Sequence, residues 1–182
     1  MNKRVLVPLA SGVEELEAVT IIDLLRRAGI EVVVAGLDQG VVTASRGVRL
    51  LPDTTLDDAL KQEFDMVALP GGLPGSDNLA ADSRIIEILQ KMSESGRFVG
   101  AVCAAPKVLV RSGVLKGKTA TAYPGVLEAE HHPMISGDSV TRDGRIITSR
   151  SAGTAMDFAL ELIEALSGAE TRQAVETSLK RT

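Results

Sequence analysis

The feature that most constrains the fold is a regular alternation between short apolar runs and longer segments with helical spacing of apolar residues. The apolar runs lack polar alternation, which is typical of strands buried on both faces. They lie at residues 5–10, 30–37, 64–72 and 97–103. Helical spacing is found at residues 11–29, 83–96, 105–113, 153–166 and 169–182. This alternation predicts an α/β fold, a parallel sheet with helices on both faces.

Further short elements complete the pattern. Two short strands around a turn are expected in residues 41–53, a strand at 118–125, and a hairpin at 138–149 around Asp143-Gly144. Ser11 is expected to cap the first helix and Gly29 to end it.

Length and composition limit the class of protein. The 182 residues suit a single domain, 1–182, around one core. The net charge is −4 and aromatic residues are 2%, which disfavours a nucleic-acid reader. No segment approaches the ~18 apolar residues of a membrane span, and no signal-peptide core is present. A single cysteine fits a reducing compartment, so we expect a cytoplasmic protein with no membrane partner.

The single cysteine, Cys103, lies where a buried strand meets a helix. Small residues flank it, as a tight strand-to-helix turn requires, and such turns carry the nucleophile of α/β hydrolases. A helix start favours an anion, so we expect a lowered thiol pKa. The alternative is a buried cysteine that acts only as a small apolar residue.

Two other strand ends have polar or flexible neighbours. Gly71 and Gly72 follow the strand at 64–72, where a turn can aim an N–H at the same place as the N–H of Ala104 and form an oxyanion hole. The alternative is an ordinary Pro-Gly-Gly loop. Three acids, Glu14, Glu15 and Glu17, crowd the start of the first helix. Glu17, if desolvated near the thiol, would have a raised pKa, but the residues alone do not favour it over its two neighbours. The alternative for these acids is a solvated partnership with the helix dipole.

Together these stretches carry a family resemblance. "LASGVEELEAV", "ALPGG", "AVCAAP" and "TSRSAGTAMDFAL" occur in that order from Val5 to about Leu166. Their combination resembles the ThiJ/PfpI family, and most closely its DJ-one and YajL-like branch. The resemblance implies a flavodoxin-like three-layer α/β/α sandwich of the class I glutamine amidotransferase-like type, usually a homodimer.

The resemblance also implies roles for particular residues. It makes Cys103 the reactive cysteine, Glu17 a protonated glutamic acid, and Gly72 and Ala104 the oxyanion donors. Arg27 and Arg46 match arginines that, in such dimers, approach the cysteine pocket and hold an anion. No cofactor or metal is implied.

The sequence departs from the family pattern in two places. In glyoxalase-active relatives a histidine stands beside the cysteine, whereas here the stretch is "TAYP" and the position holds Tyr123. Ser151 and Ala152 replace the usual Gly-Pro, which reshapes one pocket wall. His131 and His132 lie in "AEHHPM" and are expected to be a solvent-facing pair rather than metal ligands.

Two functional hypotheses follow, and they belong to different classes. The first is an enzyme in which the Cys103 thiolate adds to methylglyoxal (a glyoxalase) or to glycated protein or nucleotide adducts (a deglycase), with Glu17 and Tyr123 moving protons. The second is a redox-responsive sensor or chaperone-like stress protein with little turnover, since a reactive thiol is oxidised first by peroxide. A fold relative with an inert cysteine is the remaining alternative.

Overall fold

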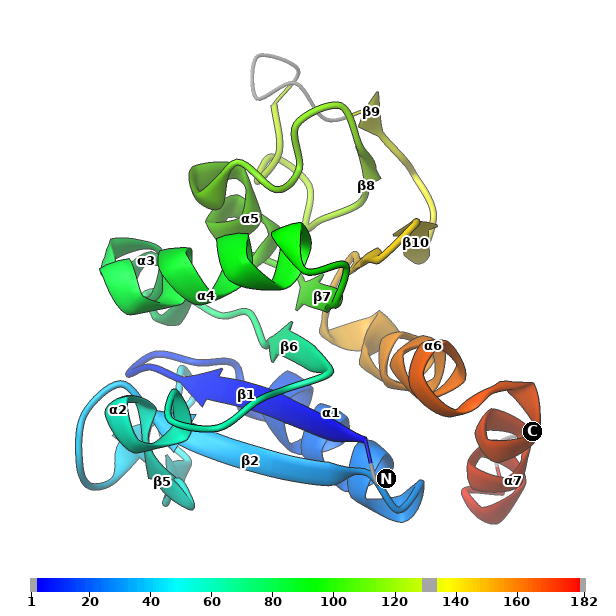
Figure 1. The fold of residues 1–182 in the computed structure, drawn as a ribbon, viewed down its shortest axis with the longest axis horizontal. Helices are drawn as coiled ribbons and strands as arrows, with labels where there is room; N and C mark the ends of the chain where they lie inside the picture. The colour runs from blue at the N-terminus through cyan, green and yellow to red at the C-terminus, as the bar shows by residue number, and fades with distance from the viewer. Residues whose placement is uncertain (1–2, 129–133, 181–182) are drawn as a thin grey trace.

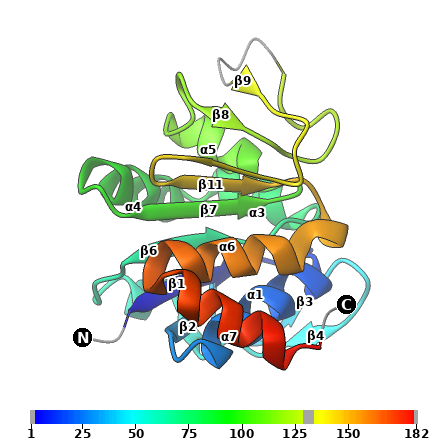
Figure 2. The same cartoon turned by 90° about the vertical axis from the view of Figure 1, so that its right-hand side faces the viewer.

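The computed structural model describes residues 3–128 and 134–180, which form a seven-stranded sheet with helices on both faces (Figures 1 and 2). The strand order is β10-β11-β7-β6-β1-β2-β5. These strands are β1 (Arg4–Leu9), β2 (Glu31–Gly36), β5 (Thr54–Thr55), β6 (Met66–Leu69), β7 (Phe98–Val102), β10 (Val140–Asp143) and β11 (Ile146–Ser149). Neighbouring strands are parallel except for β10, which runs antiparallel to β11. The predicted three-layer α/β/α sandwich is confirmed.

The helices divide between the two faces of the sheet. One face is covered by α1 (Glu15–Arg27), α6 (Ala155–Ser167) and α7 (Ala169–Ser178). The other is covered by α2 (Leu56–Ala59), α3 (Gly75–Ala81), α4 (Ser83–Glu94) and α5 (Pro106–Ser112). Along β1, Val5 and Val7 face the first core while Leu6 faces the second. Successive strand residues point to opposite faces and both faces are buried, so β1 is a continuous apolar run.

Smaller elements lie outside the main sheet. The antiparallel hairpin β3 (Val42–Thr43) and β4 (Arg49–Leu50) was predicted, as was the β10–β11 hairpin. The strand expected at 118–125 is only β8 (Thr119–Ala120), which pairs with β9 (Met134–Ile135), and a short 3₁₀ helix covers Ala152–Thr154. Sequence reasoning missed α2, α3 and β5, because these segments are too short to show a period.

The start of α1 differs from the prediction. Ser11 does not cap this helix; Glu14 does, and its carboxylate accepts the N–H of Glu17 at 2.8 Å. Gly12, with φ +85°, turns the chain first, which moves the helix start beyond Ser11. Gly29 follows the last turn with φ +72°, which confirms it as the helix stop.

This topology gathers three loops at one edge. Strands β7, β6 and β1 are neighbours and parallel, so the segments that follow them meet at their carboxyl ends. Ligand sites of open α/β sheets lie at this edge. In the described part of the chain, no helix combines the length and apolar character needed to cross a membrane.

Candidate active site

A pocket of about 460 Å³ lies at the carboxyl ends of these central strands. It contains six of the seven predicted site residues, all except Arg27. Its lining residues are Glu14, Glu17, Ser45, Arg46, Gly72, Leu73, Cys103, Ala104, Tyr123, Val126, Ser151, Ala152 and Gly153. Residues far apart in the sequence therefore share one cavity.

The backbone at Cys103 forms a sharp turn between β7 and α5. Its φ is +60°, in the left-handed region, which costs a non-glycine residue on the order of 1–2 kcal/mol. Two backbone hydrogen bonds fix this conformation: Cys103 N–H donates to the Ser149 carbonyl at 2.9 Å, and the Cys103 carbonyl accepts from Tyr123 N–H at 2.9 Å. The thiol is half-buried and faces the pocket. The predicted strand-to-helix turn is present, in a strained conformation that its neighbours hold.

Glu17 is fully buried and lines the inner end of the pocket. Its Oε2 accepts the N–H of Gly71 at 2.8 Å, and its carboxyl group lies within hydrogen-bonding reach of the Cys103 thiol. Oε1 accepts no hydrogen bond from any of the described residues. Burial raises the pKa of Glu17 to about 7; the Glu14 charge adds to the rise, and the bonds from Gly71 and Cys103 oppose it. The predicted raised pKa is confirmed.

The thiol pKa differs in direction from the prediction. Burial, followed by the charge of the Glu17 carboxylate, raises the pKa of Cys103 to about 12. Hydrogen bonds from the N–H groups of Ala104 and Gly72 act the other way but are smaller. Helix α5 begins at Pro106, three residues beyond the cysteine, so the helix start is too far along the chain to decide the balance.

The two glycines after β6 allow this close packing. A Cβ at Gly71 would lie 2.7 Å from Glu17 Oε2 and 2.8 Å from Cys103 Cβ. Gly72 has φ +94°, and a Cβ there would collide with the backbone of Glu14. Only glycine at both positions lets the loop after β6 approach α1 and Cys103 together. The Gly72 N–H hydrogen-bonds the sulfur, as does that of Ala104.

The three residues predicted to bind substrate or an anion at the pocket separate into two groups. Arg46 and Tyr123 line the pocket, and Tyr123 is 53% exposed. Arg27 lies in the last turn of α1 and pairs with Asp23 at 2.7 Å, away from the pocket of its own chain. Its approach to the pocket of a second copy stays a prediction.

Comparison with known proteins is consistent with this geometry. The profile of the DJ-1/PfpI family matches residues 3–165. The chain belongs to this family. It is 43% identical to protein dj-1beta of Drosophila melanogaster, covering 98% of this chain and 97% of that one, and its fold matches the dj-1beta crystal structure, with full coverage of both chains and a TM-score of 0.95.

Two further family members are relevant. The glutathione-independent glyoxalase DJR-1.2 of Caenorhabditis elegans is 36% identical over 86% of this chain and 84% of that one. A structure described as Toxoplasma gondii DJ-1, oxidized, shares 37% identity over 97% of each chain, with a TM-score of 0.92.

Sequence reasoning missed part of this family member's pocket wall. Glu14, Ser45, Leu73, Val126 and Gly153 were not singled out, although they line the pocket. Glu14 and Leu73 adjoin predicted residues and could have been found by proximity. Ser45 and Val126 lie on loops, and the sequence contains no pattern that predicts the path of these loops. The replaced positions Ser151 and Ala152 do form one wall, as expected.

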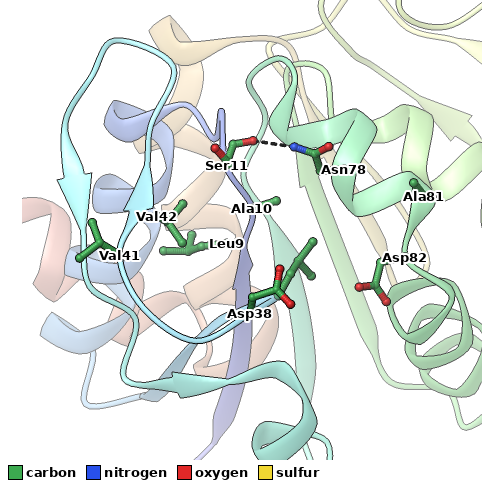
Figure 3. Close-up of a pocket in the computed structure, with 10 residues that line it drawn as sticks. Leu9, Ala10, Ser11, Asp38, Val41, Val42, Asn78, Ala81 and Asp82 are labelled. Atoms are coloured by element: carbon green, nitrogen blue, oxygen red, sulfur yellow. Dashed lines mark hydrogen bonds between the residues drawn. The ribbon is translucent and has the colours of Figure 1, made fainter.

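A second hollow of about 470 Å³ lies between the β3 segment and α3 (Figure 3). The Ser11 carbonyl accepts the Asn78 amide there at 2.9 Å, and Asp38 and Asp82 face the opening. Among residues 3–128 and 134–180, no cluster of His, Cys, Asp or Glu could hold a metal ion; His131 and His132 lie outside the described residues.

Proposed function

We propose that this protein is a cysteine-dependent enzyme that acts on reactive carbonyl compounds, with glyoxalase or deglycase chemistry. The observation that carries the proposal is the convergence of Cys103, buried Glu17 and the N–H groups of Gly72 and Ala104 in one pocket. A nucleophile, a proton carrier and oxyanion donors are the parts that carbonyl addition needs. The relative named as a glyoxalase supports the same class of reaction.

The protonation of the Cys103–Glu17 pair decides whether the nucleophile exists. Glu17 has a pKa of about 7 and Cys103 of about 12, so above pH 7 the pair holds one proton and one negative charge, and the charge lies mainly on Glu17. The N–H groups of Gly72 and Ala104 favour the charge on sulfur. The proposed reaction uses the minor form of the pair, in which the Glu17 carboxyl carries the proton and hydrogen-bonds the charged Sγ. With Glu17 neutral, the carboxylate charge no longer raises the thiol pKa, and burial remains as the larger cause of the rise.

The reaction with methylglyoxal follows from this arrangement. Sγ of Cys103 bonds to the aldehyde carbon, and the aldehyde oxygen becomes an oxyanion held by Gly72 and Ala104. Glu17 gives its proton to that oxygen and, now ionised, takes the proton from the aldehyde carbon while the hydroxyl proton passes to the ketone oxygen, which forms an enediolate. Glu17 then gives its proton to the former ketone carbon, and the product is a lactoyl thioester on Cys103. Water cleaves the S–C bond, which releases lactate, restores the thiolate and returns one proton to Glu17. With a glycated amine adduct, Sγ bonds to the carbinol carbon while its C–N bond breaks, and the amine leaves with the proton from Glu17.

A second function is favoured by one observation. Tyr123, not a histidine, stands beside Cys103 and lines the pocket. A histidine base contributes typically 10²–10⁴-fold, so its absence favours a redox-responsive or chaperone-like protein with little turnover. Because the chain has one cysteine, oxidation would run through sulfenic to sulfinic acid without an internal disulfide.

The proposal includes a homodimer in the cytoplasm. Leu16 and Val19 on α1 are 52% and 48% exposed, and Val48, which is 48% exposed, lies against the same helix. Contiguous exposed apolar side chains of this kind mark interaction surfaces. A second copy would also bring its Arg27 toward the pocket, as predicted. The single cysteine suits a reducing compartment.

Steady-state turnover of methylglyoxal, followed by lactate formation, tests the enzyme. We expect Cys103→Ser to abolish turnover, and Glu17→Gln to reduce it at least tenfold because the proton carrier is lost. Glu87→Gln, an exposed glutamate on α4, is the matched control and should be unchanged. Turnover retained in Cys103→Ser would exclude this nucleophile. Absent turnover in a wild-type protein that peroxide readily oxidises would support the redox function instead.

A further inference from the structure

The turn between β3 and β4 is attached to the start of α1 through a single carboxylate. Glu15 Oε1 accepts the N–H of Arg46 at 2.9 Å and that of Val48 at 3.4 Å. Oε2 accepts the Ser45 hydroxyl at 3.0 Å. One side chain therefore satisfies three donors of a turn about thirty positions away in the chain.

The same turn forms part of the wall of the cysteine pocket. Ser45 and Arg46 line the pocket with Cys103, whereas Glu15 does not. The Ser45 N–H donates to the Val13 carbonyl at 2.8 Å, and inside the turn the N–H groups of Ala44 and Gly47 donate to the carbonyls of Val48 and Ala44 at 2.8 and 3.0 Å. These bonds hold the turn on either side of Arg46, and Glu15 accepts the N–H of Arg46 itself. Within the described residues, the only hydrogen bond of the Arg46 side chain is to the Ser45 carbonyl, at 3.5 Å.

We propose that Glu15 is a positioning residue that holds Arg46 at the mouth of the Cys103 pocket, where its guanidinium attracts anionic reactants. This inference rests on the proposed function only in taking Cys103 as the reacting group. Glu15 occupies the first position of α1, where a carboxylate ordinarily just complements the helix dipole. Here both oxygens are instead used by another segment.

The ionisation of Glu15 agrees with this geometry. Partial burial raises its pKa, but hydrogen bonds from its own amide, Ser45, Val48 and Arg46 outweigh burial and hold the pKa below the usual value. The carboxylate is therefore ionised at neutral pH, as an acceptor of three donors must be. Glu14 and Glu17 also face the pocket, so Arg46 is the cation that offsets acidic neighbours there.

Alkylation of Cys103 separates a positioning role from a simple charge effect. Iodoacetate is anionic and iodoacetamide is neutral; with both, an S–C bond forms and iodide leaves. The rate constant for iodoacetate divided by that for iodoacetamide reports the charge at the pocket mouth. The fraction of Cys103 present as thiolate affects both rate constants equally, so it cancels from this ratio. If Glu15 positions Arg46, Glu15→Ala should lower the ratio about threefold, as loss of one nearby positive charge does. If Glu15 contributed only its own charge, removing that negative charge would raise the ratio.

Controls complete the experiment. Arg46→Gln should lower the ratio by a similar factor, and the double variant should fall no further, because the two residues act as one unit. Glu87→Ala should leave the ratio unchanged. Amide exchange should become faster at Arg46 and Val48 in Glu15→Ala, while Ser45, bonded to Val13, stays protected.

Each outcome decides a different point. A raised or unchanged ratio in Glu15→Ala would overturn the positioning role. A wild-type cysteine inert to both reagents would overturn the proposed enzyme, and amide exchange at Arg46 and Val48 would then decide the role of Glu15 alone. If Glu15→Ala does not fold, the wild type and Arg46→Gln decide the inference. Rapid hydrogen exchange at the Arg46 amide of the wild type would refute it. Slow exchange there, together with a lowered alkylation ratio in Arg46→Gln, would support it.

Discussion

Adding one methyl group at Gly71 is the sharpest steric test of the site. A Cβ there would lie 2.7 Å from Glu17 Oε2, 2.7 Å from the Val102 carbonyl and 2.8 Å from Cys103 Cβ, whereas ordinary contact begins at 3.4 Å. Val102 and Cys103 belong to the central strand and its strained turn, so they cannot yield. The loop after β6 and the Glu17 side chain must therefore separate by roughly 0.7 Å.

The energetic consequence has two parts. Overpacking of a tight site costs about 1–3 kcal/mol. The 2.8 Å bond from Gly71 N–H to Glu17 would lengthen beyond hydrogen-bonding distance, and a buried acceptor without its partner costs about 1–3 kcal/mol more. For a chain of 182 residues, each kcal/mol lowers Tm by roughly 2–4 °C. We expect Gly71→Ala to lower Tm by about 5–15 °C and turnover by at least about tenfold, since Gly72 and Glu17 move together.

Thermal unfolding and lactate formation, measured on the same preparations, check this prediction. Gly137→Ala is the matched control, because nothing lies within 4 Å of a Cβ at Gly137 and its φ is not in the left-handed region. The control should stay within about 1 °C of wild type. If Gly71→Ala melts within about 2 °C of wild type and keeps its turnover, close packing at Gly71 does not build the site.

Three other predictions address ionisation, the missing base and assembly. Burial raises the pKa of Glu17 from 4.5 to about 7, so the free energy of unfolding should fall by about 3 kcal/mol as the pH rises through this range. In thermal melts from pH 4 to 8, Glu17→Gln should flatten this dependence. Tyr123→His should raise methylglyoxal turnover at least about tenfold, and no gain in kcat would show that a base at this position is not limiting. Leu16→Asp should convert a dimer to a monomer in sedimentation, and an unchanged mass would place the interface elsewhere.

Much of the fold was predictable because its signals are local. The buried strands are recognisable as apolar runs. The helix end at Gly29 and the turn at Asp143-Gly144 were predictable because glycine readily adopts the positive φ that each position has. The elements that were missed, such as α2 and β5, are too short for a period and depend on tertiary contacts. The cap at Glu14 in place of Ser11 depends on the turn at Gly12, which packs against the loop after β6.

By itself, the sequence determined the layered α/β architecture and the placement of Cys103 at the end of a buried strand. It also marked the Gly71-Gly72 pair and the acids at the start of the first helix as candidates, because both groups follow strand ends, and the family resemblance chose Gly72 and Glu17 among them. Tertiary structure alone decided their electrostatics, since desolvation and a neighbouring carboxylate depend on what packs around the sulfur. A helix start predicted a lowered thiol pKa, whereas burial beside Glu17 raised it. Likewise, only the folded chain brings Glu15 to the turn that carries Arg46, because no local pattern records a contact between segments about thirty residues apart.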